Sequence, residues 1–431
     1  MTALIAILNK NAVALAADSA VTSRKIHNSA NKLFTLSKFE PVAVMVYGMS
    51  EFMRLPWETV IKMYRSQLGE TQFQHLEDYA SDFLRYLSSE ALIVPATRQA
   101  AVLVDTMRAV LYEIRESILT EVRKRVGGAL PLAEEQVPDL VAEVVTTHKD
   151  AFLQYPRLAG FDEEFEDNFI RLHAEEIRDL ARTVFEDLPI NHVLEDIKLV
   201  CCYRFTRDYW STHSGLVFAG FGRQNVLPVV KAYRVECVFS GRLRHRFDDQ
   251  LSSDLNSDEG NAVIIPYAQF DVVHRFLKGI DGTYRKQYST HLRTLLCETY
   301  PERLIAEAAI EDEDELRTKK AELIHFGRNA VEEFNGAWEK FEQSTFVQPV
   351  IDVIAELPIQ ELASIAESLL SLTSLQRKIT NTAETVGGPV DVAVISKGDG
   401  FVWIKRKHYF DKELNVGFFG NYFRPSGGGD E

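Results

Sequence analysis

Apolar residues in the first 50 positions form short runs separated by turn residues. Residues 4–8 and 13–17 are two such runs, and Asn9-Lys10-Asn11 between them has turn chemistry. Two apolar runs joined by a short polar turn predict a β-hairpin, here with both strands buried on both faces. Two more strands and a helix are expected to follow, namely strands at 32–36 and at 42–46, the latter ending at Gly48, and a helix from about Ser50.

Between about residues 71 and 195 the apolar positions follow helical spacing. Val104, Met107, Leu111 and Ile114 fall on one face of a helix, and the whole segment is charged and poor in glycine. The pattern therefore predicts a helical insertion. Strands are expected again at 198–205, 215–220 and 229–239, followed by a helix at 268–277 and a second helical insertion at 286–345.

The end of the chain has the clearest succession of elements. Apolar residues from Leu362 to Ile379 follow helical spacing, Gly387-Gly388-Pro389 ends that helix, and strands are expected at 390–395 and 401–404. Runs of strands separated by runs of helices predict an α+β fold. Its expected parts are a β-rich core at 1–70, 196–285 and 346–412, helical insertions at 71–195 and 286–345, and a tail at 413–431, flexible at its end.

Composition and charge narrow the function classes. The chain has 431 residues, of which 46% are hydrophobic and 26% charged, and these values exclude wholesale disorder. With 48 Lys and Arg against 63 Asp and Glu, the formal net charge of −15 disfavours nucleic-acid binding. No apolar run is long enough for a membrane helix, and no positive charge precedes the N-terminal run as in a signal peptide. A cytoplasmic protein that binds neither nucleic acid nor membrane is expected.

The cysteines and histidines form no ligand pattern. Four cysteines without CxxC spacing indicate reduced thiols, and the histidines form no HExxH motif. The glycines form neither a Walker nor a Rossmann motif. The sequence therefore predicts no metal and no cofactor.

Candidate chemistry begins at Thr2. A small residue after Met1 permits removal of that methionine, which would give Thr2 a free α-amine that titrates at about pH 8 and can act as general base for its own hydroxyl. Many proteins begin Met-Thr, so Thr2 alone indicates little. Asp18 closes the hairpin and Lys32 begins the next strand, so both are expected near Thr2. Lys32 would lower the pKa of the hydroxyl, Asp18 would keep Lys32 charged, and the Gly48 N–H is a candidate oxyanion donor.

In this order the residues resemble the start of a proteasome-type β subunit, which belongs to the N-terminal nucleophile (Ntn) hydrolases. The matching segments are Thr2, Ala16-Ala17-Asp18-Ser19, Asn31-Lys32-Leu33-Phe34 and Gly48. Later segments resemble the middle and closing strands of that family, and with them the resemblance covers about half of the chain. They are 214–220 with Pro228 and Tyr233, and 387–392 followed by 400–403. A start at Met-Thr without a propeptide is similar to the bacterial Anbu proteasome-like group.

The resemblance implies a four-layer αββα sandwich enlarged by helical insertions. It implies a hydrolase, either a threonine protease or an amidase, that cleaves peptide or amide bonds through an acyl-enzyme ester. Thr2 would be the nucleophile, Lys32 would tune it, Asp18 would orient Lys32, and the Gly48 N–H would bind the oxyanion. The family also implies peptide or protein substrates and homo-oligomeric rings or spirals. The helical insertions are candidate surfaces for a protein partner.

Three features depart from the family pattern. The spacing from Asp18 to Lys32 is two residues shorter, so the connecting loop must differ. The family's second active-site serine has no clear match, and Ser253 and Ser257 are weak candidates for it. The family's Asp and Ser before the closing glycines fall at Ala383 and Val386 here, with Glu384 nearby. The supporting residues are therefore expected to differ more than the fold.

Three other functions remain open from the sequence. An inactive proteasome-like scaffold predicts that Met1 is retained or that Thr2 lies away from Lys32. A small-molecule amidase of the same superfamily predicts a closed pocket under an insertion instead of an open cleft between strands. A helical interaction module that uses the sandwich as a platform predicts that residues 70–195 carry the binding activity alone.

Overall fold

A computed structural model describes residues 3–22, 26–27, 30–126, 134–257, 260–308, 312–379, 388–408, 410, 413–415 and 417 of the chain. Ten of its strands form two five-stranded sheets in which all neighbours are antiparallel. In order, the first sheet contains β12 (Ala262–Tyr267), β1 (Leu4–Asn9), β2 (Ala12–Ala17), β13 (Asp391–Ser396) and β14 (Gly400–Lys405). The second sheet contains β11 (Arg242–Asp254), β10 (Val229–Phe239), β9 (Ser214–Gly220), β6 (Val42–Gly48) and β5 (Leu33–Thr35).

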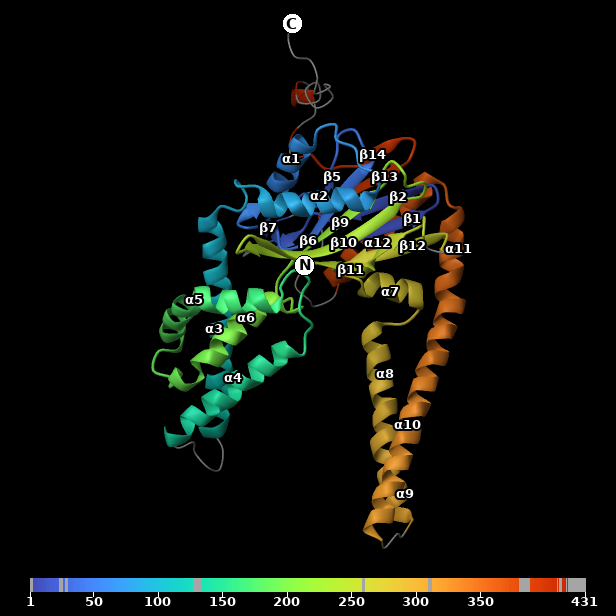
Figure 1. Cartoon of the computed structure of the whole chain (residues 1–431). Coiled ribbons are helices and arrows are strands. Elements are labelled where there is room, and N and C mark those ends of the chain that lie inside the picture. The colour runs from blue at the N-terminus through green and yellow to red at the C-terminus, as the bar shows by residue number, and fades with distance from the viewer. Residues whose placement is uncertain are drawn as a thin grey trace.

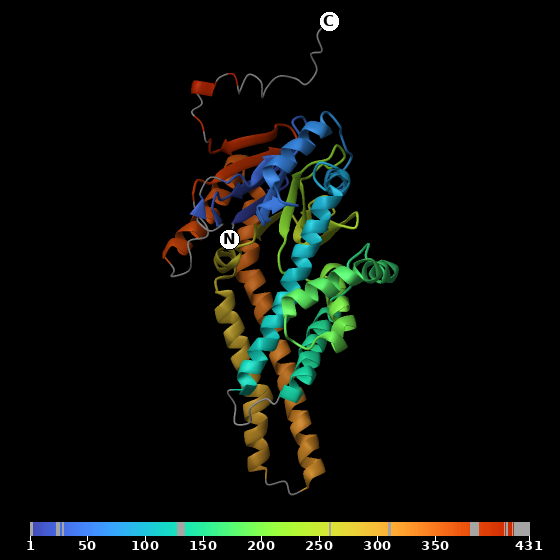
Figure 2. The ribbon, with the colours of Figure 1, turned by 90° about the vertical axis from the view of Figure 1, so that its left-hand side faces the viewer.

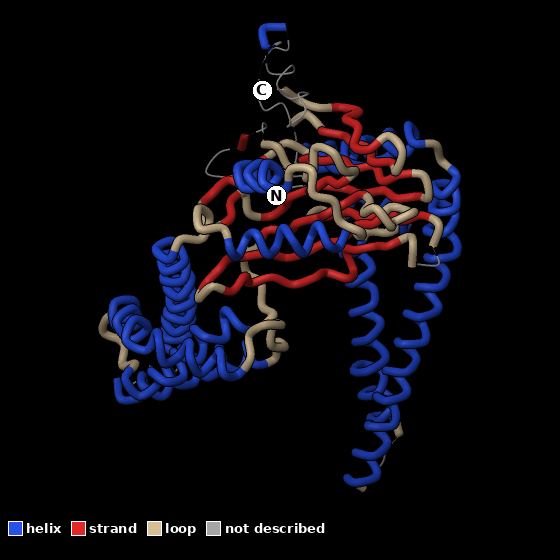
Figure 3. Tube along the Cα trace, turned by 45° about the horizontal axis from the view of Figure 1, so that its top comes forward, coloured by secondary structure: helices blue, strands red, loops and turns tan. Residues whose placement is uncertain are grey.

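Three hydrophobic clusters hold the sheets and helices together in layers. One cluster lies between the two sheets, where Leu15 and Ala17 of β2 belong to the same buried group as Met45 of β6 and Val217 of β9. A second cluster packs the second sheet against helices α1 to α6, and a third packs the first sheet against α7, α11 and α12. Helices therefore cover the outer face of each sheet (Figures 1 and 3), and the α+β class is confirmed.

The helices fall into two groups along the chain. The first group is α1 (Trp57–Leu68), α2 (Leu76–Ser89), α3 (Ala96–Val126), α4 (Val137–Leu153), α5 (Glu163–Phe185) and α6 (Leu194–Thr206). The second is α7 (Asp271–Lys278), α8 (Gly282–Thr294), α9 (Tyr300–Glu307), α10 (Glu313–Glu342), α11 (Gln348–Glu356) and α12 (Ile359–Ile379), with π-helical turns at Leu295–Thr299 and Gln343–Val347. Three short 3-10 turns lie at Glu134–Gln136, Asn191–Val193 and Glu413–Asn415.

Two helical projections extend from the same end of the sheets. Figures 1 and 2 show α3 to α6 as one projection and α8 to α10 as a second, narrower arm. Both coincide broadly with the segments expected to be insertions, although the boundaries between core and insertions stay a prediction. The expected flexible end of the tail lies outside the described residues.

The N-terminal hairpin forms as predicted, with every residue of β1 and β2 buried. The register pairs Leu4 with Ala17 and Leu8 with Val13. On its other side β1 pairs with β12, so that Leu4 also lies opposite Tyr267. The start of β1 is thus enclosed between the end of β2 and the end of β12.

Two predicted elements are wrong. Residues 198–205 form helix α6 instead of a strand. This helix is buried on nearly all sides, and a short run of residues that is buried in this way shows no periodicity by which a helix can be told from a strand.

The helix expected from about Ser50 begins only at Trp57, because residues 51–56 form a tight hairpin of β7 (Glu51–Phe52) and β8 (Leu55–Pro56). Its two turn residues, Met53 and Arg54, both have positive φ, as a type I′ turn requires, without the usual Asn-Gly signal. The two remaining short strands, β3 (Val21–Thr22) and β4 (Ile26–His27), pair with each other.

A buried charged network joins α6 to the second sheet. The guanidinium of Arg244 in β11 is fully buried, and Arg204 of α6 and Arg244 both pair with the carboxylate of Glu236 in β10. Arg244 also donates to the backbone carbonyls of Phe205 (2.8 Å) and Arg207 (2.7 Å). Since buried charges are tolerated only when paired and hydrogen-bonded, these contacts fix how the helical projection meets the sheet.

Replacing Arg244 should therefore destabilise the protein strongly. Arg244→Met leaves the Glu236 carboxylate with one cation and deprives backbone carbonyls of a buried donor, which should lower the free energy of unfolding by about 3 kcal/mol. The measurement is the midpoint of urea unfolding. Arg246→Met is the matched control on the same strand, because Arg246 pairs with Asp208 and is half exposed; its loss should cost less than about 1 kcal/mol. Equal losses for the two variants would contradict the importance given to the buried network.

Candidate active site

The carboxylate of Asp18 lies directly after β2, beside the start of β1. Its Oδ1 accepts a hydrogen bond from the Ala3 N–H (3.0 Å), and the Asp18 N–H donates to the Ala3 carbonyl (3.1 Å). The second carboxylate oxygen accepts from the Ala20 N–H (3.3 Å). Thr2 lies outside the described residues. Asp18 thus binds the backbone N–H of Ala3, the residue that follows Thr2 in the chain.

Lys32 comes directly before β5 and reaches the same carboxylate. Its Nζ lies 2.7 Å from Asp18 Oδ1, and the side chains of Lys32 and Asp18 are only 6% and 1% exposed. The ammonium also donates to the Ala20 carbonyl. Burial lowers the pKa of Lys32, since a low-dielectric environment disfavours the charged form; the carboxylate of Asp18 opposes this and the nearby cation of Lys407 adds to it.

A second acid–lysine pair stands beside the first. Asp391 begins β13 opposite Ala17 and is buried, and both the N–H (2.9 Å) and the Nζ of Lys407 donate to its carboxylate. Sequence reasoning missed this pair. The available signal was a carboxylate inside the apolar run 390–395, since a charge in a buried strand needs a partner.

Gly48 ends β6 with a φ of +82°, a left-handed conformation that favours glycine. A Cβ atom at this position would lie 2.3 Å from the carbonyl oxygen of His213, so no side chain fits. The Val46 N–H donates to the Lys32 carbonyl (2.8 Å). Backbone N–H groups two residues apart on a strand point to the same side, which directs the Gly48 N–H toward the side of Lys32.

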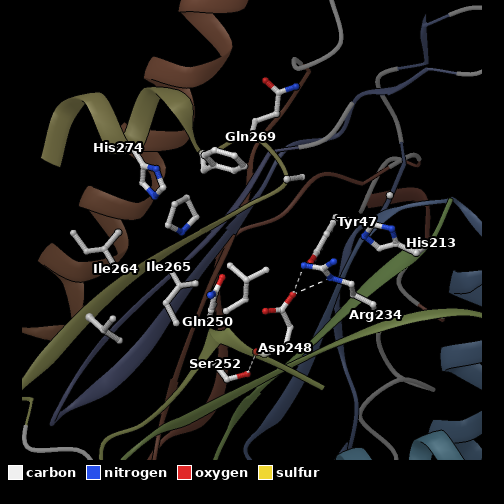
Figure 4. A pocket seen from close by; sticks show the side chains of 16 residues that line it. Tyr47, His213, Arg234, Asp248, Gln250, Ser252, Ile264, Ile265, Gln269 and His274 are labelled. Carbon is white, nitrogen blue, oxygen red and sulfur yellow. Dashed lines mark hydrogen bonds and ion pairs between the residues drawn. The ribbon is translucent and has the colours of Figure 1, made fainter. Parts of the chain in front are cut away.

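A pocket of about 730 Å³ opens beside Gly48 (Figure 4). Gly48 and Tyr47 form one wall with His213, and residues 250–252 of β11 and 263–266 of β12 form others. Arg234 and Asp248 form an ion pair in it at 2.7 Å. Tyr47 connects this wall to the start of β1, because its ring packs against Tyr267, whose backbone lies opposite Leu4.

The chain after β12 bends sharply next to this pocket. The Gln269 N–H donates to the Tyr267 carbonyl (2.8 Å), and Ala268 between them has a φ of +65°. This is a γ-turn of the rare, strained kind. It places Ala268 and buried Gln269 where β12 approaches the start of β1, a position that sequence reasoning did not single out.

The weaker sequence candidates lie elsewhere or outside the described residues. Ser253 pairs with Val230 within the second sheet, and the Ser257 N–H donates to the Asp254 carbonyl in the turn after β11. Neither is among the residues that line the pocket beside Gly48. Positions 383, 384 and 386 lie outside the described residues. The structure thus brings Asp18 and Lys32 into contact and sets Gly48 beside the pocket, while the catalytic roles of these residues remain predictions.

The metal-ligating, thiol and membrane features of the described part of the chain are as follows. No group of three or more His, Cys, Asp or Glu in the described residues is placed to hold a metal ion. All four cysteines are buried without a disulfide, and burial raises the pKa of the Cys201 and Cys237 thiols to about 12. Among the helices that the structure describes, none has the length and apolar character needed to cross a membrane.

Comparisons with known proteins find similarity to solved structures at low sequence identity. No family model matches the chain, and no curated protein matches it. Among solved structures, the chain is similar to a mutant of Anbu from Hyphomicrobium sp. strain MC1, with 9% sequence identity and a TM-score of 0.28. The alignment covers 98% of this chain and 92% of that chain. A TM-score this low does not establish a shared fold, so the function has to be argued from the site itself.

Proposed function

We propose that this protein is an N-terminal nucleophile hydrolase of the threonine type, built on an αββα sandwich. After removal of Met1, the Thr2 hydroxyl attacks a peptide or amide carbonyl and the Thr2 α-amine takes up the hydroxyl proton. The charged Lys32 side chain stabilises the alkoxide, Asp18 holds Lys32 in place, and the Gly48 N–H stabilises the oxyanion. The α-ammonium gives this proton to the leaving amine as the C–N bond breaks, and water then hydrolyses the ester left on Thr2.

The observation that carries this proposal is the position of Asp18 between Lys32 and the backbone of Ala3. One carboxylate oxygen accepts from both the Ala3 N–H and the Lys32 ammonium. A buried lysine paired with the carboxylate that also binds the Ala3 N–H is an unfavourable arrangement for stability alone, because both charges lose their hydration. It is favourable for activating a hydroxyl at residue 2, since a cation there stabilises developing negative charge.

The pocket beside Gly48 supports a peptide substrate over a small molecule. Side chains alternate along a strand, so runs of consecutive lining residues mean that the strand edges, and not their faces, border the pocket. Such a run occurs in β12 (263–266), whereas residues 250–252 of β11 lie where its register with β10 is interrupted. Within the described residues β12 pairs only with β1, so its other edge borders the pocket. Unpaired strand edges are suited to binding an extended peptide through backbone hydrogen bonds.

Loss of the Thr2 hydroxyl tests the proposal directly. Thr2→Ala should abolish cleavage of internally quenched peptides, lowering kcat by at least about 10³-fold, because no acyl-enzyme can form. The purified wild-type protein, treated with a peptide boronate or epoxyketone, should gain mass at the N-terminal peptide by intact and tandem mass spectrometry.

The control for this experiment is Thr71→Ala, a substitution in the loop after α1 that should leave cleavage and labelling unchanged. Retained Met1, or full hydrolytic activity of Thr2→Ala, would contradict the proposal and favour an inactive scaffold.

The pH profile of kcat/KM should be bell-shaped, and its fall on the alkaline side should come at a lower pH than an ordinary lysine would give. Activity should rise as the Thr2 α-amine loses its proton at about pH 8. It should fall again when Lys32 deprotonates, and because burial lowers the pKa of Lys32, this fall should come below the range of an ordinary lysine. The check is kcat/KM for one quenched peptide between pH 6 and 11, compared with the unfolding midpoint at each pH. An activity that stays constant through the alkaline range would contradict a role for charged Lys32.

A further inference from the structure

His213 stands at the junction between a helical projection and the candidate site. It ends the loop that follows α6, directly before β9. Its carbonyl accepts from the Met49 N–H (3.1 Å), and it is the atom that a Cβ on Gly48 would strike. The backbone of His213 therefore lies in contact with the proposed oxyanion donor.

The loop that carries His213 is held rigidly by the buried Arg244 network. Arg244 donates to the carbonyls of Arg207 (2.7 Å) and Tyr209 (2.5 Å), and its guanidinium lies over the Trp210 ring at 4.1 Å. Glu236 also accepts from the Thr212 hydroxyl (3.2 Å), one residue before His213. A loop fixed at four successive points places its last side chain in a defined position.

The imidazole of His213 forms part of the pocket wall between aromatic neighbours. Its ring lies edge-on to Tyr47 (6.5 Å between centroids) and to Trp210 (5.9 Å), and Figure 4 shows it near Tyr47 and Arg234. Burial lowers the pKa of His213, and the cations of Arg234 and Arg244 lower it further, against the carboxylates of Glu236 and Asp248. The ring is therefore neutral at pH 7 to 8.

The other groups of the pocket carry no net charge at that pH. Arg234 and Asp248 neutralise each other as an ion pair. Burial also lowers the pKa of His274, which lies in the same pocket on α7. The remaining walls include apolar side chains such as Val263 and Phe270. A charged substrate side chain entering this pocket would lose hydration without gaining a partner.

We propose that His213 is a substrate-contacting residue, presented to the pocket by the loop after α6, and that its charge determines how strongly the pocket prefers an uncharged substrate side chain over an acidic one. This inference rests on the proposed hydrolase function, since it concerns the substrate of the same site. It also gives the first helical projection a role at the site, because α6 and Arg244 fix the loop that ends at His213. Protonation of His213 at acidic pH adds a positive charge and favours an acidic side chain.

The test compares pairs of quenched peptides. The two peptides of a pair differ at a single residue, which is Asp in one and Asn in the other. This residue is placed in turn at each of the two positions before and the two positions after the cleaved bond. The measured quantity is the ratio of their kcat/KM values, from which pH effects on the catalytic groups cancel. At pH 8 the Asn peptide should be preferred at one position by about tenfold or more. Lowering the pH below the ordinary range of histidine should raise the Asp/Asn ratio there by about fivefold, since the charge that His213 gains attracts the carboxylate.

His213→Gln should keep the preference for Asn but remove its pH dependence. His213→Phe, which preserves the aromatic contacts with Tyr47 and Trp210, should also keep the preference for Asn without its pH dependence. This second variant replaces the first if His213→Gln folds poorly. His325→Gln, exposed on α10, should behave as the wild type.

A rise in the Asp/Asn ratio that persists in both His213 variants would overturn the inference while leaving the hydrolase proposal intact. If no peptide is cleaved by the wild type, the proposed function fails and this inference fails with it.

Discussion

The buried ion pair between Asp18 and Lys32 is the interaction on which the arrangement of the candidate site depends. It joins the end of β2 to the residue before β5, and thus connects the first sheet to the second. The same carboxylate binds the Ala3 N–H at the start of β1. Removing either charge would leave the other buried without its counter-charge, at a cost of several kcal/mol. Three segments that are separate in the sequence are therefore held at one point by a single carboxylate.

Two further constraints position the opposite side of the site. Gly48 allows β6 and the residue before β9 to approach to a distance that excludes any Cβ. Arg244 then ties the loop before β9 to β10 and β11 through a network centred on its fully buried guanidinium. The first helical projection enters the sheet through this loop, so its attachment and the pocket wall depend on the same contacts. The contacts that attach the first helical projection to the sheet therefore also position the pocket wall.

Local chemistry in the sequence predicted the parts of the fold that depend on near neighbours. The hairpin 4–17 follows from apolar runs around Asn9-Lys10-Asn11, and the spacing of Asp18 from that hairpin placed it beside the chain start. What the sequence could not give depends on contacts between distant segments. Helix α6 is surrounded by packing on all sides, which removes the polar face that would have revealed its period. His213 belongs to the site only because Arg244, 31 positions later, fixes its loop, and no local pattern carries that information.

The balance of charges around Lys32 explains why a second acid–lysine pair accompanies the first. A lysine beside a buried carboxylate is ordinarily held charged, so that Asp18 alone would raise the pKa of Lys32. Burial acts in the other direction, and so does the cation of Lys407, which the segment after β14 brings close. Lys407 itself is tolerated there because Asp391 accepts two hydrogen bonds from it. The net result is a lysine that remains paired yet gives up its proton more readily than one in water. In the proposed mechanism the Lys32 ammonium stays protonated, and its lowered pKa makes it a stronger hydrogen-bond donor to the developing alkoxide.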